Sequence, residues 1–122
     1  MLEFESVAVG ILAVDRMLKK SPVALLRCGS VHPGRYLALF GGTVASTEEA
    51  YAEGVIVGKE GEALISGILL QDPTKGVSEA MVGGRNEPVG DTLGVFEVST
   101  SPGLLGLVDK LLKAVPVNLV EI

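Results

Sequence analysis

The chain repeats part of itself at a fixed offset. Residues 14–27 read VDRMLKKSPVALLR and residues 108–121 read VDKLLKAVPVNLVE, an offset of 94 residues (108 − 14). Seven of these fourteen aligned positions are identical, against roughly one expected by chance from average residue usage. The two segments are therefore homologous, and the chain consists of one unit and the opening part of a second.

This period indicates tandem domains. Solenoid units run to roughly 20 to 50 residues, whereas a longer period suits a duplicated small domain. Residues 83–90 have the composition of a linker. The predicted organisation is a first domain at residues 1–82, the linker at 83–90, and a partial second domain of strand, helix and strand at 91–122.

Composition narrows the possible partners. The net charge of −5 and the aromatic content of 4% argue against nucleic acid, whose recognition needs basic patches and stacking rings. No apolar run reaches the roughly 18 residues of a membrane helix. A single Cys cannot form an internal disulfide, so a reducing, cytoplasmic location is expected. The apolar share of 48% is high for 122 residues and indicates subunit contacts.

Apolar periodicity predicts two helices in the first unit. The first begins after the capping residue Ser6 and ends before Pro22. The second opens at Thr43 or Ser46, with Ser46-x-x-Glu49 as a capping box, and runs to about residue 58. The apolar face of the first helix is predicted to contain Gly10, Ala13, Val14, Met17 and Leu18, joined by Val7 and Ile11.

Strands are expected at residues 1–4, 23–26, 36–40 and 64–70, and the middle two should form a hairpin with a long tip. The order strand, helix, strand, strand, helix, strand predicts an α+β sandwich of the ferredoxin-like split βαβ kind, with a four-stranded antiparallel sheet under two helices. A short helix is expected at 74–81. The second copy is expected to hold a strand at 93–98, a helix at 104–113 with an apolar face, and a strand at 117–122; that face comprises Leu104, Leu107, Val108, Leu111 and Leu112.

The sequence carries no recognised catalytic motif. It has one His and one Cys, no Gly-x-Gly-x-x-Gly after a strand, and no lysine after Gly41-Gly42 to make a phosphate loop. An enzymatic function is therefore not expected.

Three segments together resemble a known family. Residues 15–19 (DRMLK), residues 32–36 (HPGRY) and the Gly41-Gly42 turn into the second helix resemble the bacterial microcompartment (BMC) shell domain. The resemblance is closest to the tandem-domain type, in which three chains form a pseudo-hexameric tile. It implies a structural protein of the microcompartment shell that forms trimers or hexamers, tiles into layers with other shell proteins, and offers a pore to small metabolites. Because the second domain is incomplete, the chain is expected to be either a fragment of a longer tandem protein or a short form.

The resemblance also implies roles for particular residues. Lys19 and Lys113 occupy the positions of a lysine at the edge between adjacent tiles; the alternative is a solvated lysine on a polar helix face. Residues 30–35 correspond to the loop that lines the central pore, and the alternative is a plain surface hairpin. These pore-loop residues are Ser30, Val31, His32, Pro33, Gly34 and Arg35.

No metal or other cofactor is expected. Some tandem shell proteins carry a Cys at the position of His32 and bind an iron–sulfur cluster on the trimer axis. Such clusters usually need four thiolates, and Cys28 lies four residues earlier, so it is predicted to be a buried, inert thiol. A ring of His32 side chains on the axis remains open as an adventitious zinc or nickel site.

Two questions remain open at this stage. The same topology suits a small-molecule-binding regulatory module, which would stay a discrete oligomer where a shell protein forms layers. Residues 93–122 carry an apolar face that three isolated elements cannot bury. They are expected to pack against another copy by strand or helix exchange, possibly with residues 93–98 standing in for the first strand; the alternative is a frayed remnant.

Overall fold

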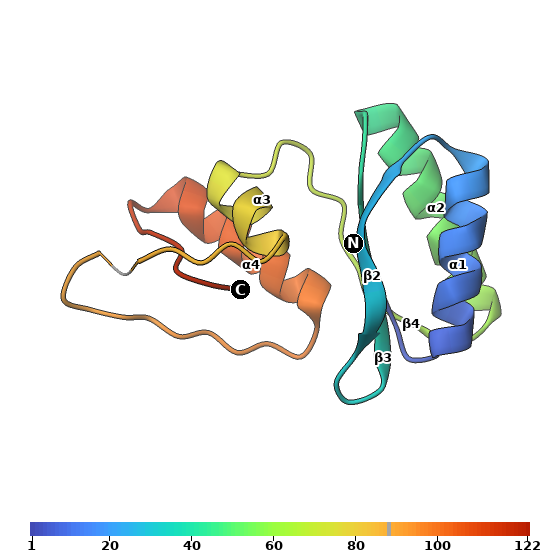
Figure 1. Cartoon of the computed structure of the whole chain (residues 1–122), viewed down its shortest axis with the longest axis horizontal. Helices are drawn as coiled ribbons and strands as arrows, with labels where there is room; N and C mark the ends of the chain where they lie inside the picture. The colour runs from blue at the N-terminus through green and yellow to red at the C-terminus, as the bar shows by residue number, and fades with distance from the viewer. Residues whose placement is uncertain (88) are drawn as a thin grey trace. The chain divides into compact units, whose positions relative to one another are not determined.

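A computed structural model describes residues 1–87 and 89–122, which form two units, Met1–Leu69 and Leu70–Ile122. Within these described residues, the first unit contains all the strands and two of the four helices (Figure 1). Its elements are β1 (Leu2–Phe4), α1 (Val7–Lys20), β2 (Ala24–Val31), β3 (Arg35–Gly41), α2 (Val44–Glu60) and β4 (Leu64–Gly67). The second unit holds α3 (Lys75–Met81) and α4 (Ser101–Ala114).

The strands form one antiparallel sheet in the order β2-β3-β1-β4. The short strand β1 lies at the centre, where Leu2 pairs with Ala38 on one side and with Gly67 on the other. Helices α1 and α2 pack together and cover one face of the sheet (Figure 1). The predicted α+β split βαβ fold is confirmed.

Close packing between the helices and the sheet explains why glycines recur on both helices. Leu2, Phe4 and Met17 are almost completely buried in the core. A Cβ atom on Gly10 would lie 2.9 Å from the Cβ of Tyr36. The backbone of α1 therefore contacts the side chain of Tyr36 on β3 directly, and no space is left for a methyl group on residue 10.

The helix caps confirm one prediction and correct another. Ser6 caps α1 and accepts a hydrogen bond from the amide of Val9, as predicted. Helix α2 is capped by Thr43, whose Oγ1 accepts from the amide of Ser46 at 3.2 Å. The predicted capping box from Ser46 to Glu49 is wrong, because Ser46 already lies inside the helix and is buried.

The hairpin tip is shorter than predicted. Pairing between β2 and β3 runs from Ala24 opposite Gly41 to Val31 opposite Arg35, with one irregularity between Leu25 and Arg27. The long tip is therefore wrong, because the backbone stays paired up to a three-residue turn at residues 32–34. The last strand is also shorter than predicted and ends at Gly67.

The second unit keeps the predicted helices, but its described residues include no strand. The strands expected at 93–98 and 117–122 are absent, because no neighbouring strand is present in this unit to pair with them. Apolar residues of the first segment are consequently exposed, with Val95 at 84%. Residues 93–98 were one candidate to replace the first strand of the sheet, but β1 occupies that position between β3 and β4.

The boundary between the two units falls after Leu69. Helix α3 therefore belongs structurally with α4, although the repeat assigns it to the first copy. The domain limits expected from homology, 1–82 and 91–122 with a linker at 83–90, stay a prediction. Within the described part of the chain, no helix combines the length and apolar character needed to cross a membrane.

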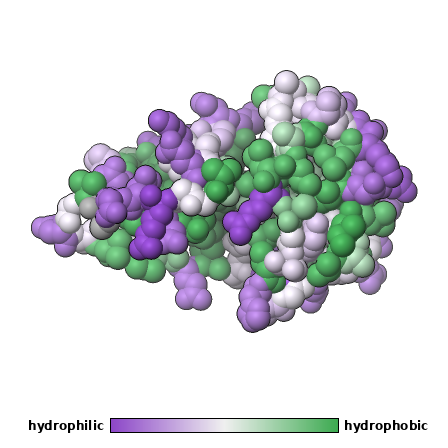
Figure 2. Space-filling model, in the orientation of Figure 1, coloured by the Kyte–Doolittle hydropathy of each residue, from purple (hydrophilic) through white to green (hydrophobic). Residues whose placement is uncertain are grey.

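The predicted apolar face is confirmed in part for α1 and is largely wrong for α4. In α1, Gly10, Ala13, Val14 and Met17 are buried as predicted, whereas Val7, Ile11 and Leu18 are exposed. In α4, Leu107 is exposed and the buried set is Pro102, Leu105, Gly106, Val108 and Asp109. Apolar side chains thus remain on the surface of the chain, as the space-filling view shows (Figure 2).

Candidate functional site

The hairpin tip between β2 and β3 is the first candidate site. It consists of the exposed residues His32, Pro33 and Gly34. Gly34 has a φ of +108°, which only glycine adopts easily, and its amide donates to the carbonyl of Val31 at 2.9 Å. Of the six predicted pore-loop residues, these three form the tip, whereas Ser30 and Val31 lie in β2 and Arg35 opens β3.

Arg35 is directed back from the tip toward the sheet. Its Nη1 lies 2.8 Å from Oε1 of Glu3 in the central strand, and Glu3 is only 2% exposed. A buried carboxylate needs such a partner. The charge of Arg35, one of the predicted pore-loop residues, is therefore compensated by Glu3. Sequence analysis did not single out Glu3. An acidic residue between two large apolar residues of a predicted strand, Leu2 and Phe4, is the sequence signal that could have indicated a buried ion pair.

Cys28 is exposed in the edge strand β2, so the prediction of a buried thiol is wrong. It pairs with Ala38 in the register and lies near Tyr36. Burial raises the pKa of Tyr36, and a hydrogen bond with Cys28 adds to the effect. Among the residues that the structure describes, no group of three or more His, Cys, Asp or Glu side chains is placed to hold a metal ion.

The two predicted tile-edge lysines form equivalent ion pairs. Lys19 Nζ lies 2.7 Å from Asp15 Oδ2, and Lys113 Nζ lies 2.7 Å from Asp109 Oδ2. Lys19 is 72% exposed, whereas Lys113 is 46% exposed and also donates to the carbonyl of Asp72 at 3.0 Å. The first lysine is therefore available to a neighbour, and the second is held within its unit.

Asp109 is the residue that distinguishes the second pair. The residue is 5% exposed, and its Oδ1 accepts from the amide of Thr74 at 2.9 Å. Burial alone would raise the pKa of Asp109, but the hydrogen bonds from Lys113 and Thr74 hold it below its ordinary value. Its identity with Asp15 in the repeat was the sequence signal that could have found it.

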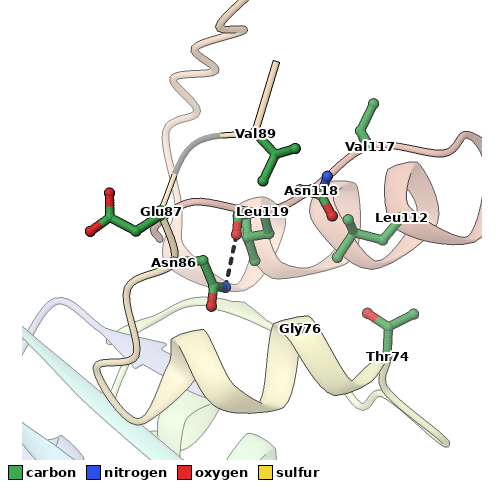
Figure 3. A pocket seen from close by; sticks show the side chains of 9 residues that line it. All are labelled: Thr74, Gly76, Asn86, Glu87, Val89, Leu112, Val117, Asn118 and Leu119. Carbon is green, nitrogen blue, oxygen red and sulfur yellow. Dashed lines mark hydrogen bonds between the residues drawn. The ribbon is translucent and has the colours of Figure 1, made fainter.

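The second unit also contains a cavity of about 510 Å³ (Figure 3). On one side Asn86 donates through Nδ2 to the carbonyl of Leu119 at 2.9 Å. Among the described residues of the lining, Glu87 is the one titratable side chain. The lining residues are Thr74, Gly76, Asn86, Glu87, Val89, Leu112, Val117, Asn118 and Leu119.

Comparison with known sequences identifies the family. The profile of the BMC domain matches residues 1–73, which cover the whole sheet with α1 and α2. The chain belongs to the BMC domain family. The resemblance seen in the sequence is thus confirmed at the level of the family.

Two relatives extend the match beyond the first domain. The chain is 30% identical over 121 residues to the bacterial microcompartment shell protein PduT of Citrobacter freundii, covering 99% of this chain and 65% of that protein. It superposes on a microcompartment protein from Desulfitobacterium hafniense with a TM-score of 0.73 and 26% identity, covering 98% of this chain and 66% of that one. The chain therefore spans about two thirds of the length of these relatives. The first relative is by name a shell protein, and the second is by name a microcompartment protein.

Proposed function

We propose that the chain is a tandem-type structural subunit of a bacterial microcompartment shell. It forms a ring of three-fold or six-fold symmetry, tiles into layers with other shell proteins, and leaves at the hairpin tips a pore for small metabolites. The observation that carries this proposal is the repetition of α1 in α4. Each helix has fourteen residues, a hydroxyl cap three residues before the amide it binds, and the same lysine–aspartate pair.

The ring is tested by light scattering. The exposed apolar residues of α1 and residues 93–98 require contacts that one chain does not supply. We expect the mass of a trimer or a hexamer at micromolar concentration. A stable monomer or a two-fold dimer would contradict the proposal.

Layer formation is tested at Lys19, whose ammonium is exposed. Charge reversal in Lys19→Asp should abolish extended layers in electron micrographs and leave the ring intact, because the lysine acts between rings. Lys20→Asp is the matched control, since Lys20 is exposed and the repeat has Ala114 in its place. Layers that persist in Lys19→Asp would make Lys19 a solvated lysine only, and the role of Lys113 would fall with it.

The pore is tested at the hairpin tip. If the tips converge on the ring axis, a His32→Cys substitution in a Cys28→Ser background should give disulfide-linked chains under mild oxidation. The background variant alone supplies the control, because it has no thiol. A His32→Cys protein that forms a ring but no linked chains would place the tips away from the axis.

A further inference from the structure

The carboxylate of Glu3 lies on the face of the sheet that α1 and α2 do not cover. Side chains alternate across a strand, and the neighbours Leu2 and Phe4 pack into the core against these helices. Glu3 pairs with Leu37 in the register of β1 with β3. Arg35 lies two residues before Leu37 and shares its face, so it is the diagonal neighbour of Glu3. The central strand therefore places a carboxylate within reach of the residue that opens β3 beside the hairpin tip.

This ion pair cancels the one permanent charge of the predicted pore loop. Within residues 30–35, the ionisable side chains are His32 and Arg35. Nη1 of Arg35 lies 2.8 Å from Oε1 of Glu3, and the Arg35 side chain is 34% exposed. A charge-assisted hydrogen bond of this length holds both groups in place. The exposed tip at residues 32–34 is thus presented without an uncompensated arginine beside it.

Burial makes this compensation independent of the surrounding salt. Ions in solution screen exposed charges but screen buried pairs much less. Glu3 is 2% exposed, and its backbone is paired to β3 on one side and to β4 on the other. The position of the carboxylate is therefore fixed from both sides, and the charge that Arg35 shows to the tip is fixed with it.

We propose that Glu3 is a specificity-determining residue of the pore. By neutralising Arg35 in every copy of the ring, it keeps the rim from accumulating small anions and leaves the passage to uncharged polar metabolites. Copies related by rotation place equivalent charges at equal distances from the axis, so their fields add. Removal of the carboxylate would give the rim one positive charge per hairpin. The inference deepens the proposed pore and rests on it for the convergence of the tips.

The first experiment measures the electrostatic potential at the tip and needs no pore. Anionic and cationic nitroxide probes relax the amide protons of His32 and Gly34 in proportion to the local concentration of each probe. In the parent chain at about pH 8, where histidine side chains are uncharged, the two probes should act about equally. A severalfold excess of the anionic probe would overturn the proposal on the parent protein alone, whether or not any variant folds.

Glu3→Gln keeps the shape of the side chain and removes its charge. A unit charge within about 8 Å changes the local concentration of a monovalent ion about twofold in water. The anionic-to-cationic ratio at the tip should therefore rise about fourfold. Glu60→Gln removes the same charge from an exposed residue at the end of α2 and should leave the ratio unchanged.

A double variant separates charge from structure. Arg35→Gln added to Glu3→Gln removes both partners, so the probe ratio should return to that of the parent. A purely structural role for the pair would not be reversed in this way. An unchanged ratio in Glu3→Gln, or a raised ratio that persists in the double variant, would overturn the proposal.

The second experiment measures the selectivity of the assembled pore. Reversal potentials in planar lipid bilayers under a KCl gradient should show little preference between the two ions for the parent. Glu3→Gln should move the reversal potential toward that of chloride, and the double variant should restore it. Conductance without this shift would overturn the role of Glu3. No conductance in any of these proteins would contradict the pore itself, whereas the probe ratios would still decide the charge at the tip, so the two failures are distinguishable.

Discussion

The two copies of the repeated sequence fold alike in their helices and differently in their strands. Helices α1 and α4 begin at equivalent hydroxyl caps and end at equivalent residues, Ser21 and Val115, whose amides donate to Met17 and Leu111. All these bonds join residues close in the chain. A helix can therefore form from the hydrogen bonds within its own segment, whereas a strand needs a second strand, from elsewhere in the sequence, to pair with.

The first strand shows the contrast most clearly. Leu2 and Phe4 are fully buried in the central strand β1. Their counterparts at the offset of 94 are Phe96 and Val98, which are exposed and belong to no strand. Burial of the first pair comes from β3, β4 and the helices α1 and α2. Among the described residues of the second unit, only α1 has a counterpart, α4.

The largest expected difference is in hydrogen exchange. Amides of β1 should be protected by orders of magnitude, close to the global stability of the first unit, while amides 95–98 exchange nearly freely. Mass spectrometry of exchange on the dilute chain measures both. Protection of 95–98 that rises with protein concentration would instead show pairing with another copy, as the exchange hypothesis requires.

Exchanging one residue between the copies tests their packing. Gly10→Leu installs the residue found at 104, and we expect a loss of about 3 kcal/mol in the first unit, because Tyr36 leaves no room for a Cβ. Leu104→Gly should cost the second helix about 1 kcal/mol through helix propensity. Urea denaturation measures both, and a harmless Gly10→Leu would contradict the close contact.

The two aspartates should differ in their contribution to stability. Asp109→Ala leaves the amide of Thr74 and the ammonium of Lys113 without their buried acceptor, at a cost of about 2 kcal/mol to the pairing of α3 with α4. Asp15→Ala breaks an exposed pair and should change stability by less than about 0.5 kcal/mol. Thermal unfolding of the two variants measures both changes in stability. Equal losses would contradict the expected difference between the buried and the exposed aspartate.

The smallest effect concerns pH. The pKa of Asp109 is lowered from its ordinary 3.8, so its contribution is present above pH 3.8 and is lost as the pH falls through the lowered pKa. The amide shift of Thr74 should titrate with a midpoint below 3.8. Asp109→Asn should remove the transition, and a midpoint above 3.8 would mean that burial outweighs the hydrogen bonds.

Sequence patterns correctly predicted the features that depend on residues close together in the chain. The cap at Ser6 and the end of α1 before Pro22 are short-range features. The fold of the first unit was predicted from the order of its strands and helices along the chain, which the structure confirms. The hairpin tip was predicted too long because cross-strand pairing up to Val31 depends on the partner strand.

The buried faces of the helices were less accessible to prediction. Exposed Ile11 and buried Asp109 both contradict a hydrophobic stripe, because the side that packs depends on which element lies next to the helix. The pair of Arg35 with Glu3 depends likewise on the alignment of β3 with β1. For the proposed pore and tile-edge positions, sequence supplied the residues, and their roles remain predictions.

The contact of Gly10 with Tyr36 has a mechanical consequence. Tyr36 lies near the tip of the hairpin, two residues past Gly34, and its ring packs against α1 at Gly10. Because closely packed groups transmit strain, we expect a small shift of α1 to displace Tyr36 and the start of β3. A partner that binds the outer surface of that helix should therefore also change the position of the exposed tip at residues 32–34.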